Sequence, residues 1–238
     1  PPLAVKKAAA ALLLLGVTGS ALATDYSGST VSSGIQFVSA GDKADNVTVT
    51  SSGVQKVLDG ASTTDTVVTG GDQDVVGGTA TSTQLNSGGA QHLISGSTTG
   101  TIVNKGSRQT VSGGSAISTT VNSGGYQDIY SGGSASGTVL NGGSQYIHSG
   151  SAISTAVNSG SHQAIYSGGS ASDTTLNYGS YQAIYSGGSA SDTTLNTGAN
   201  QFIFSSGSAS DTVLSGGSQF VNSGGLTTST TVNSGSDQ

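Results

Sequence analysis

The sequence predicts an all-β fold, a parallel β-helix or β-solenoid whose coils are about 18–19 residues long, and three observations lead to it. A glutamine returns once in every such interval, aliphatic residues recur at two fixed distances after it, and glycines separate the short apolar runs. A fixed period of about 20 residues is typical of stacked arrays in which each repeat forms one coil. The periodic glutamines are Gln36, Gln55, Gln73, Gln91, Gln109, Gln127, Gln145, Gln163, Gln182, Gln201, Gln219 and Gln238.

The first segment, residues 1–23, has the order of a secretory signal peptide. Lys6 and Lys7 form a positive start, residues 8–17 are apolar, and small residues precede a predicted cleavage after Ala23. The apolar stretch is too short to span a bilayer as a helix. The chain opens with proline rather than methionine, so we expect the signal to be incomplete.

Two further segments follow the signal. Residues 24–54 match the repeat poorly and are expected to form an N-terminal cap and a degenerate first coil. A cap is needed because an open strand edge promotes aggregation. Residues 55–238 are the repeat region. Another copy would begin at Gln238, so we expect the repeats to continue beyond this fragment.

One repeat is clearest in the copy that starts at Gln182. It contains the run Gln-Ala-Ile-Tyr, a Gly-Gly pair, the run Ser-Ala-Ser-Asp-Thr-Thr-Leu and then Asn-x-Gly. Alternating residues between turn signals indicate short strands rather than helices. Glycine permits a positive φ at the turns, and asparagine tolerates the left-handed region. Each repeat is therefore expected to form short strands joined by tight bends.

Four columns appear when the repeats are aligned. The first aliphatic column is Val38, Val57, Val75, Leu93, Val111, Ile129, Ile147, Ile165, Ile184, Ile203 and Val221. The second is Val49, Val67, Leu85, Val103, Val121, Leu140, Val157, Leu176, Leu195, Leu214 and Val232. The small-residue column contains Ala80, Ala116, Ala135, Ala152, Ala171, Ala190 and Ala209. The asparagine column, expected to form a ladder of side-chain amides, is Asn86, Asn104, Asn122, Asn141, Asn158, Asn177, Asn196 and Asn233.

A single coil is too small to fold alone. Burial of two aliphatic side chains contributes roughly 3–6 kcal/mol, whereas fixing each backbone residue costs about 1–2 kcal/mol. Stability must therefore come from stacking, in a rod roughly 50 Å long if coils lie about 4.8 Å apart. An array of β-hairpins and a disordered low-complexity chain are the alternatives, and neither explains the aligned columns.

Composition excludes several classes of protein. The chain has a net charge of -6, with only six lysines and arginines and no cysteine. Nucleic-acid binding usually needs a basic face, and the few cations after the signal are scattered. The absence of cysteine excludes disulfides and thiolate metal sites.

Catalytic and metal-binding patterns are weak. The histidines His92, His148 and His162 fall at three repeat phases, so we expect them on different faces or levels and predict no catalytic site, metal site or cofactor. A row of aspartates could in principle hold cations or could simply keep the rod soluble. It consists of Asp173, Asp192 and Asp211. The glycine-rich nonapeptide of calcium-binding β-rolls is not matched.

An aromatic column is the best candidate for an interaction face. It lies three residues after the glutamine in five consecutive repeats and comprises Tyr130, His148, Tyr166, Tyr185 and Phe204. Period-two alternation points these rings away from the core. They could bind sugars or a partner surface, or they could only stack on one another and stabilise the sheet.

The motif S-G-G-x-A-x-x-T-x-[LV]-N-x-G, seen best over residues 167–179, closely resembles the repeat of AIDA-type autotransporter adhesins. The resemblance covers about residues 55–238. It implies a right-handed β-helical passenger on a Gram-negative outer surface, or a secreted one, that supports autoaggregation, biofilm formation and in some members host-cell adhesion. It also implies O-glycosylation by a heptosyltransferase, for which Ser131, Ser167 and Ser186 are candidate acceptors.

Three hypotheses of function follow. In the first, the chain is an adhesin that pairs with itself on neighbouring cells, with host glycans or proteins as further partners. The second is a passive stalk that displays another domain, and the third is a carbohydrate-active enzyme, which would need clustered acids that the sequence lacks. We expect no enzymatic activity, and membrane attachment only through a C-terminal barrel that these 238 residues do not contain.

Overall fold

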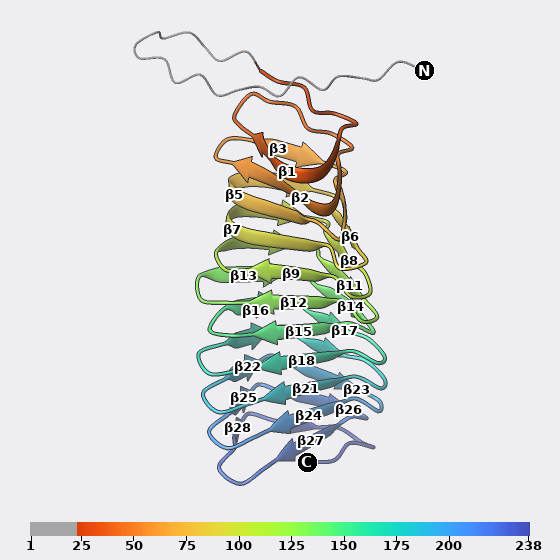
Figure 1. Ribbon diagram of the computed structural model, residues 1–238. Helices are drawn as coiled ribbons and strands as arrows, with labels where there is room; N and C mark the ends of the chain where they lie inside the picture. Colours follow the sequence, from red (N-terminus) through yellow and green to blue (C-terminus); the bar gives the residue numbers. More distant parts are fainter. Residues whose placement is uncertain (1–22) are drawn as a thin grey trace.

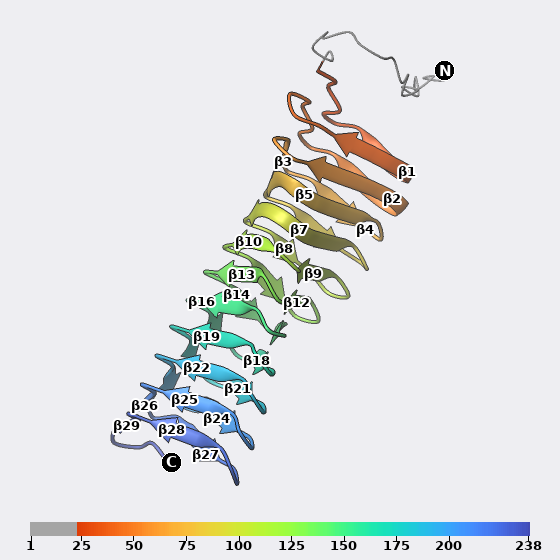
Figure 2. The same ribbon diagram turned by 90° about the vertical axis from the view of Figure 1, so that its left-hand side faces the viewer.

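The computed structural model describes residues 23–238 as a straight stack of β coils (Figure 1). The predicted signal peptide, apart from Ala23, lies outside the described residues. All strand pairings between coils are parallel, and Figure 2 shows the coils lying one below another along the rod. The predicted parallel β-solenoid is therefore confirmed.

Each complete coil has three strand segments, which build three faces of the rod. The glutamine sheet consists of β1 (Thr30–Val38), β2 (Thr48–Leu58), β5 (Asp72–Thr81), β7 (Ala90–Thr99), β9 (Arg108–Val111), β12 (Tyr126–Ile129), β15 (Ser144–Ile147), β18 (His162–Ile165), β21 (Tyr181–Ile184), β24 (Asn200–Ile203) and β27 (Ser218–Val221). In the first coils these strands are long and continue into a neighbouring face. β1 and β2 begin in the face that contains β4, and β5 and β7 end in the face that contains β3 and β10.

The other two faces are made of shorter strands. The alanine sheet contains β3 (Ser62–Thr64), β10 (Gly114–Ile117), β13 (Gly133–Ser136), β16 (Ser151–Ile153), β19 (Ser170–Ser172), β22 (Ser189–Ser191), β25 (Ser208–Ser210) and β28 (Leu226–Thr228). The leucine sheet contains β4 (Val67–Thr69), β6 (Gln84–Asn86), β8 (Ile102–Val103), β11 (Thr120–Asn122), β14 (Val139–Asn141), β17 (Ala156–Val157), β20 (Thr175–Leu176), β23 (Thr194–Asn196), β26 (Val213–Ser215) and β29 (Thr231–Val232).

The bend between the glutamine and alanine sheets needs glycine for two different reasons. Gly168 has φ +77°, a conformation that L side chains rarely adopt. Gly169 has no such φ, but a Cβ there would lie 2.6 Å from the carbonyl oxygen of Ile147 in the preceding coil. The Gly-Gly pair therefore permits both the turn and the close stacking of coils.

The core is the predicted set of aliphatic and small columns, with one correction. Val68, rather than the expected Val67, is fully buried and pairs with Val49 above and Leu85 below. Val68 follows Gln55 at the same distance as Val49 follows Gln36, so Val67 stands one position too early. Val221 and Val232, at the last coil, are exposed because no described coil covers them.

The periodic glutamines point inward and form an unbroken ladder, which the sequence reasoning did not predict. Each Nε2 donates to the Oε1 of the preceding glutamine at 2.6–2.9 Å, in eleven successive bonds from Gln238 back to Gln36. Eight threonine hydroxyls donate to the same oxygens, among them Thr101 to Gln91 at 3.0 Å. A buried amide needs such partners because an unsatisfied polar group is costly in a dry core.

The asparagine ladder was predicted and is confirmed in two runs, but Asn233 is not part of it because the preceding coil has Ser215 at this position. Asn122, Asn104 and Asn86 are linked by amide bonds of 2.7–2.8 Å. A second run of bonds at 2.7–2.9 Å links Asn196, Asn177, Asn158 and Asn141. These ladders lie at the bend that leads from the leucine sheet to the glutamine sheet.

Candidate interaction face

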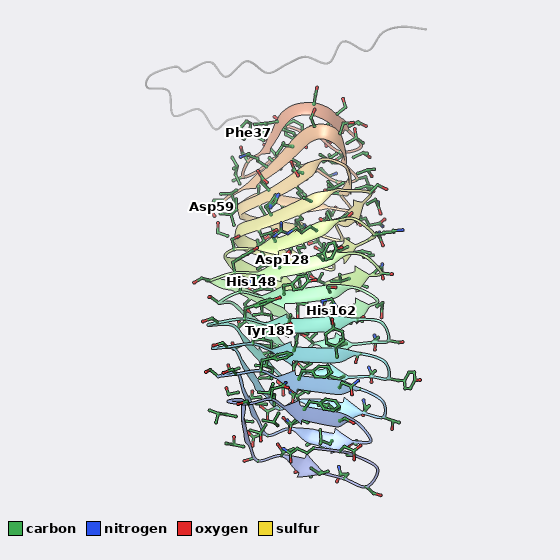
Figure 3. All side chains as sticks on the ribbon, turned by 60° about the horizontal axis from the view of Figure 1, so that its bottom comes forward. Phe37, Asp59, Asp128, His148, His162 and Tyr185 are labelled. Carbon is green, nitrogen blue, oxygen red and sulfur yellow. The ribbon has the colours of Figure 1, made fainter. Side chains whose placement is uncertain are left out.

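The outward side of the glutamine sheet carries rings from β12 to β27. They occupy the positions just before, just after and three residues after the buried glutamine, which alternation points outward. We call this surface the aromatic face, and Figure 3 labels His148, His162 and Tyr185 within it. Its rings are Tyr126, Tyr130, Tyr146, His148, His162, Tyr166, Tyr181, Tyr185, Phe202, Phe204 and Phe220.

The predicted column forms a continuous stack. Centroids of successive rings lie 5.1, 4.7, 4.9 and 5.0 Å apart from Tyr130 to Phe204, with interplanar angles of 14° or less. This spacing is close to the distance of about 4.8 Å between neighbouring strands. The ring faces therefore cover one another, while edges and phenol hydroxyls remain outside.

Further rings lie beside this column, and the sequence reasoning missed them. His162 stacks on Tyr181 with centroids 5.0 Å apart, and Phe202 stacks on Phe220 at 5.1 Å. Tyr146 joins the two columns, since its ring lies 6.4 Å from His148 and meets His162 edge-on at 5.4 Å. These residues are divided between two repeat positions and form no single column in the sequence, although the same alternation points both positions outward.

The aromatic face is a closed surface rather than a cleft. Ala164 and Ala183 point outward between the two ring columns, yet each is only 3% exposed and neither belongs to the inner core cluster. The rings on either side therefore cover them. Phe204 and Tyr185, by contrast, are 36% and 37% exposed. The outer surface of the aromatic face therefore consists of ring edges, and the alanine methyl groups lie beneath them.

Charge is absent from most of this face. Arg108 donates to Asp128 at 2.6 Å and to the hydroxyl of Tyr130 at 3.0 Å, which neutralises its upper end. From Tyr130 to Gln238 the sequence has no lysine or arginine. Burial lowers the pKa of His162, whose ring nitrogens lie 3.2–3.3 Å from the hydroxyls of Tyr146 and Ser144.

Two tyrosines add to this neutrality. Burial and neighbouring tyrosines raise the pKa of Tyr166 and of Tyr181. A tyrosine is already uncharged at neutral pH, and these shifts keep both phenols protonated further into the alkaline range.

The three histidines share this outward side of the sheet, at different levels. His92 lies four coils above His162, and its Nε2 is 3.9 Å from a carboxylate oxygen of Asp72. His148 Nε2 is 3.8 Å from Asp128. Among residues 23–238 no group of three or more His, Cys, Asp or Glu is placed to hold a metal ion.

The remaining candidate residues lie at the bends. Ser131, Ser167 and Ser186 are exposed at the turns between the glutamine and alanine sheets. The predicted aspartate row lies at the bend between the alanine and leucine sheets, with φ of 52–53°, and we call it the acidic edge. It consists of Asp173, Asp192 and Asp211. This bend is the only one of the three that does not touch the glutamine sheet.

A shallow hollow of about 350 Å³ occurs on the alanine sheet. Its lining is made only of serines, alanines and one isoleucine, including Ser170, Ala171 and Ser189. Such a lining offers no acid, base or activated nucleophile for catalysis. Within the described chain, no helix is both long enough and apolar enough to cross a bilayer.

The stacked parallel coils define a repeat-built β-solenoid protein. The family model described as "Adhesin of bacterial autotransporter system, probable stalk" matches residues 143–199. The crystal structure of a TibC-catalysed, hyperglycosylated TibA55-350 fragment is similar, with a TM-score of 0.84 and 42% sequence identity over 87% of this chain and 79% of that one. The chain belongs to the AIDA family of autotransporter adhesins. A search of curated proteins found no match.

Proposed function

We propose that this chain is an adhesin passenger, displayed on the surface of a Gram-negative bacterium, that binds copies of itself on neighbouring cells. Family membership supports the passenger role. The observation that supports self-association is the ring surface of the glutamine sheet, which is half-buried to exposed along six coils and has no lysine, arginine or carboxylate from β15 to β27. Cell clumping and biofilm formation would follow, and binding to host glycans or proteins would use the same exposed rod.

Lateral contact between rods explains why a repetitive surface would adhere. Rods anchored to two facing cells meet side by side in antiparallel orientation. Each contact repeats along the rod, and many rods act together on one cell. Weak contacts then sum, because binding of one pair raises the effective concentration of the next.

A passive stalk is the second candidate, because the matching family model is itself described as a probable stalk. In this function the rod would hold another domain away from the cell, and its own surface would be inert. The exposed rings would then only stabilise the sheet, and no enzymatic activity is part of either proposal.

Glycosylation is a further part of the proposal. The similar TibA fragment is hyperglycosylated by TibC. A related glycosyltransferase would act on exposed hydroxyls of this chain, and Ser131, Ser167 and Ser186 have the required exposure at the turns. Mass spectrometry of chain purified from its own host should then find hexose- or heptose-sized additions on peptides containing these serines, and unmodified peptides would refute this assignment.

The test of self-association displays residues 24–238 on cells through an unrelated anchor. The control cells display a chain with the order of residues shuffled within each repeat. We expect rapid settling of the first cells. When they are mixed with control cells of another colour, their clumps should exclude the control cells. Cells that stay dispersed while carrying folded, β-rich chain on their surface would refute adhesion by the repeats and leave the stalk.

A further inference from the structure

We infer that the partner of the aromatic face is the aromatic face of a second copy, and that the polar alanine and leucine sheets are not the contact surface. This inference rests on the proposed self-association and names the surface that performs it. It concerns the outward side of β12 to β27, whose rings contact one another within the chain and are covered by no element among residues 23–238.

Neutrality is the first argument for a second copy. On the glutamine sheet, the outward positions from Tyr130 to Phe220 hold rings, alanines, serines and an asparagine. None of these positions holds a lysine, arginine or carboxylate. A charged partner would lose hydration at this surface without gaining an opposite charge. A second copy brings an equally neutral layer, in which ring edges can meet ring edges and phenol hydroxyls can bond one another.

The position of the acidic edge is the second argument. Asp173, Asp192 and Asp211 lie at the bend shared by the alanine and leucine sheets, which is the bend farthest in the chain path from the glutamine sheet. Copies that met through the alanine or leucine sheets would bring two such rows toward each other. Contact through the aromatic face keeps the rows on opposite outer sides of the pair, where water and salt screen them.

The upper coils indicate how far the contact extends. From β12 upward the same side of the sheet carries ion pairs, with Lys56 Nζ 3.3 Å from Asp74 and Arg108 Nε 2.6 Å from Asp128 of β12. These charges already have partners within the chain. An antiparallel pair centred between β18 and β21 places the rings of β12 to β27 on the rings of the partner.

The size of the face predicts a weak pair. Six coils at about 4.8 Å and five residues at about 3.3 Å give roughly 470 Å² per copy, or roughly 900–1,000 Å² for the pair. Stable complexes bury about 1,200–2,000 Å², so this contact belongs with weak, transient ones. The pair should therefore form only at high concentration in solution, whereas dense display on a cell would make it effective.

The test compares two doubly charged variants in the same coil. Tyr181→Lys with Tyr185→Lys places two cations on the aromatic face, and Ser189→Lys with Ser191→Lys places two cations on the alanine sheet. Sedimentation equilibrium of residues 24–238 should show concentration-dependent dimers for the original chain and the serine variant. Dimerisation of the tyrosine variant should weaken by at least about tenfold, because uncompensated like charges would face each other.

A second measurement does not depend on how well the tyrosine variant folds. The chain has no cysteine, so a trace of a single-cysteine variant can be mixed with excess original chain. Asn200→Cys lies on the aromatic face, Ser189→Cys on the alanine sheet and Thr194→Cys on the leucine sheet. Maleimide labelling of the first should slow severalfold as the original chain is added, while labelling of the other two stays constant.

The outcomes separate this inference from the proposed function. If cells that display the chain clump but the protected cysteine is Ser189→Cys or Thr194→Cys, self-association holds and the assignment of the contact to the aromatic face is wrong. Equal dissociation constants for the dimers of the tyrosine variant and the serine variant would overturn the inference in the same way. If the original chain neither dimerises nor clumps displayed cells, the proposed function itself fails.

Discussion

The buried glutamine ladder offers the sharpest test of how this rod is stabilised. Gln163 is fully buried, donates to Gln145 at 2.7 Å and accepts from Gln182 at 2.6 Å. The substitution Gln163→Leu preserves the volume approximately but removes the amide. It leaves the Oε1 of Gln145 without this donor and the Nε2 of Gln182 without its acceptor, and the hydroxyl of Thr174 loses its partner as well.

The expected loss follows from these unpaired groups. Each buried donor or acceptor left unsatisfied costs about 1–3 kcal/mol, and burial of a leucine side chain offsets part of that sum. We expect a net loss of about 2–5 kcal/mol in the free energy of unfolding. Two control variants should lose less stability. Gln36→Leu breaks the ladder at its first member, where fewer hydrogen bonds are lost, and Ile165→Val should cost about 0.5–1.5 kcal/mol.

Urea unfolding of residues 24–238, followed by circular dichroism, measures these differences. A break in mid-array should also reduce cooperativity, because each coil of a solenoid contacts only its neighbours. Amide exchange should then accelerate most in the coils of Gln145 and Gln182. A Gln163→Leu chain within about 0.5 kcal/mol of the original would refute the reasoning, since it would mean that leucine packing replaces the amide bonds fully.

Three further predictions concern single positions. Gly169→Ala should lower stability by about 1–3 kcal/mol in urea, because the new Cβ would meet the carbonyl oxygen of Ile147; an unchanged midpoint would contradict this close stacking. Burial lowers the pKa of His162, so the unfolded chain binds the proton more readily and stability should fall as pH drops below about 6.5. His162→Phe should reduce that pH dependence in thermal unfolding, and an identical profile would argue against it. The Thr193 hydroxyl is buried and has no hydrogen-bond partner among residues 23–238, so Thr193→Val should be neutral or stabilising, whereas Thr101→Val should cost about 1 kcal/mol; equal losses would refute the assignment.

Periodicity made the fold predictable, but it located the core only where the spacing is constant. Ile147, Ile165 and Ile184 follow their glutamines by two residues and are all buried as expected. The prediction that Val67 is a core residue was wrong because the number of residues from a glutamine to the second aliphatic position differs between coils. The backbone pairs Val49 with Val68. That number is decided by which backbone groups pair across coils, and a count along one chain does not contain that information.

The interaction face was predicted in part for a similar reason. The column from Tyr130 to Phe204 repeats at one phase, so it is visible in aligned repeats. Tyr146 and His162 occupy different phases, and only the stacking of coils brings their rings to 5.4 Å. The buried glutamines were within reach of the sequence, because Gln163 and Ile165 are two residues apart on one strand and must face the same side.

The sequence by itself determined the repeat, the strands, the bends and the family resemblance, since these depend on local residue patterns repeated many times. Only the tertiary structure decided that the glutamines bond one another inside the rod and that two sets of rings merge into one neutral surface. It also placed the acidic edge, including Asp173 and Asp192, at the bend that does not touch this surface. The physical reason is that these relations join residues one full coil apart in the chain, and the parallel pairing of successive coils sets which of them meet.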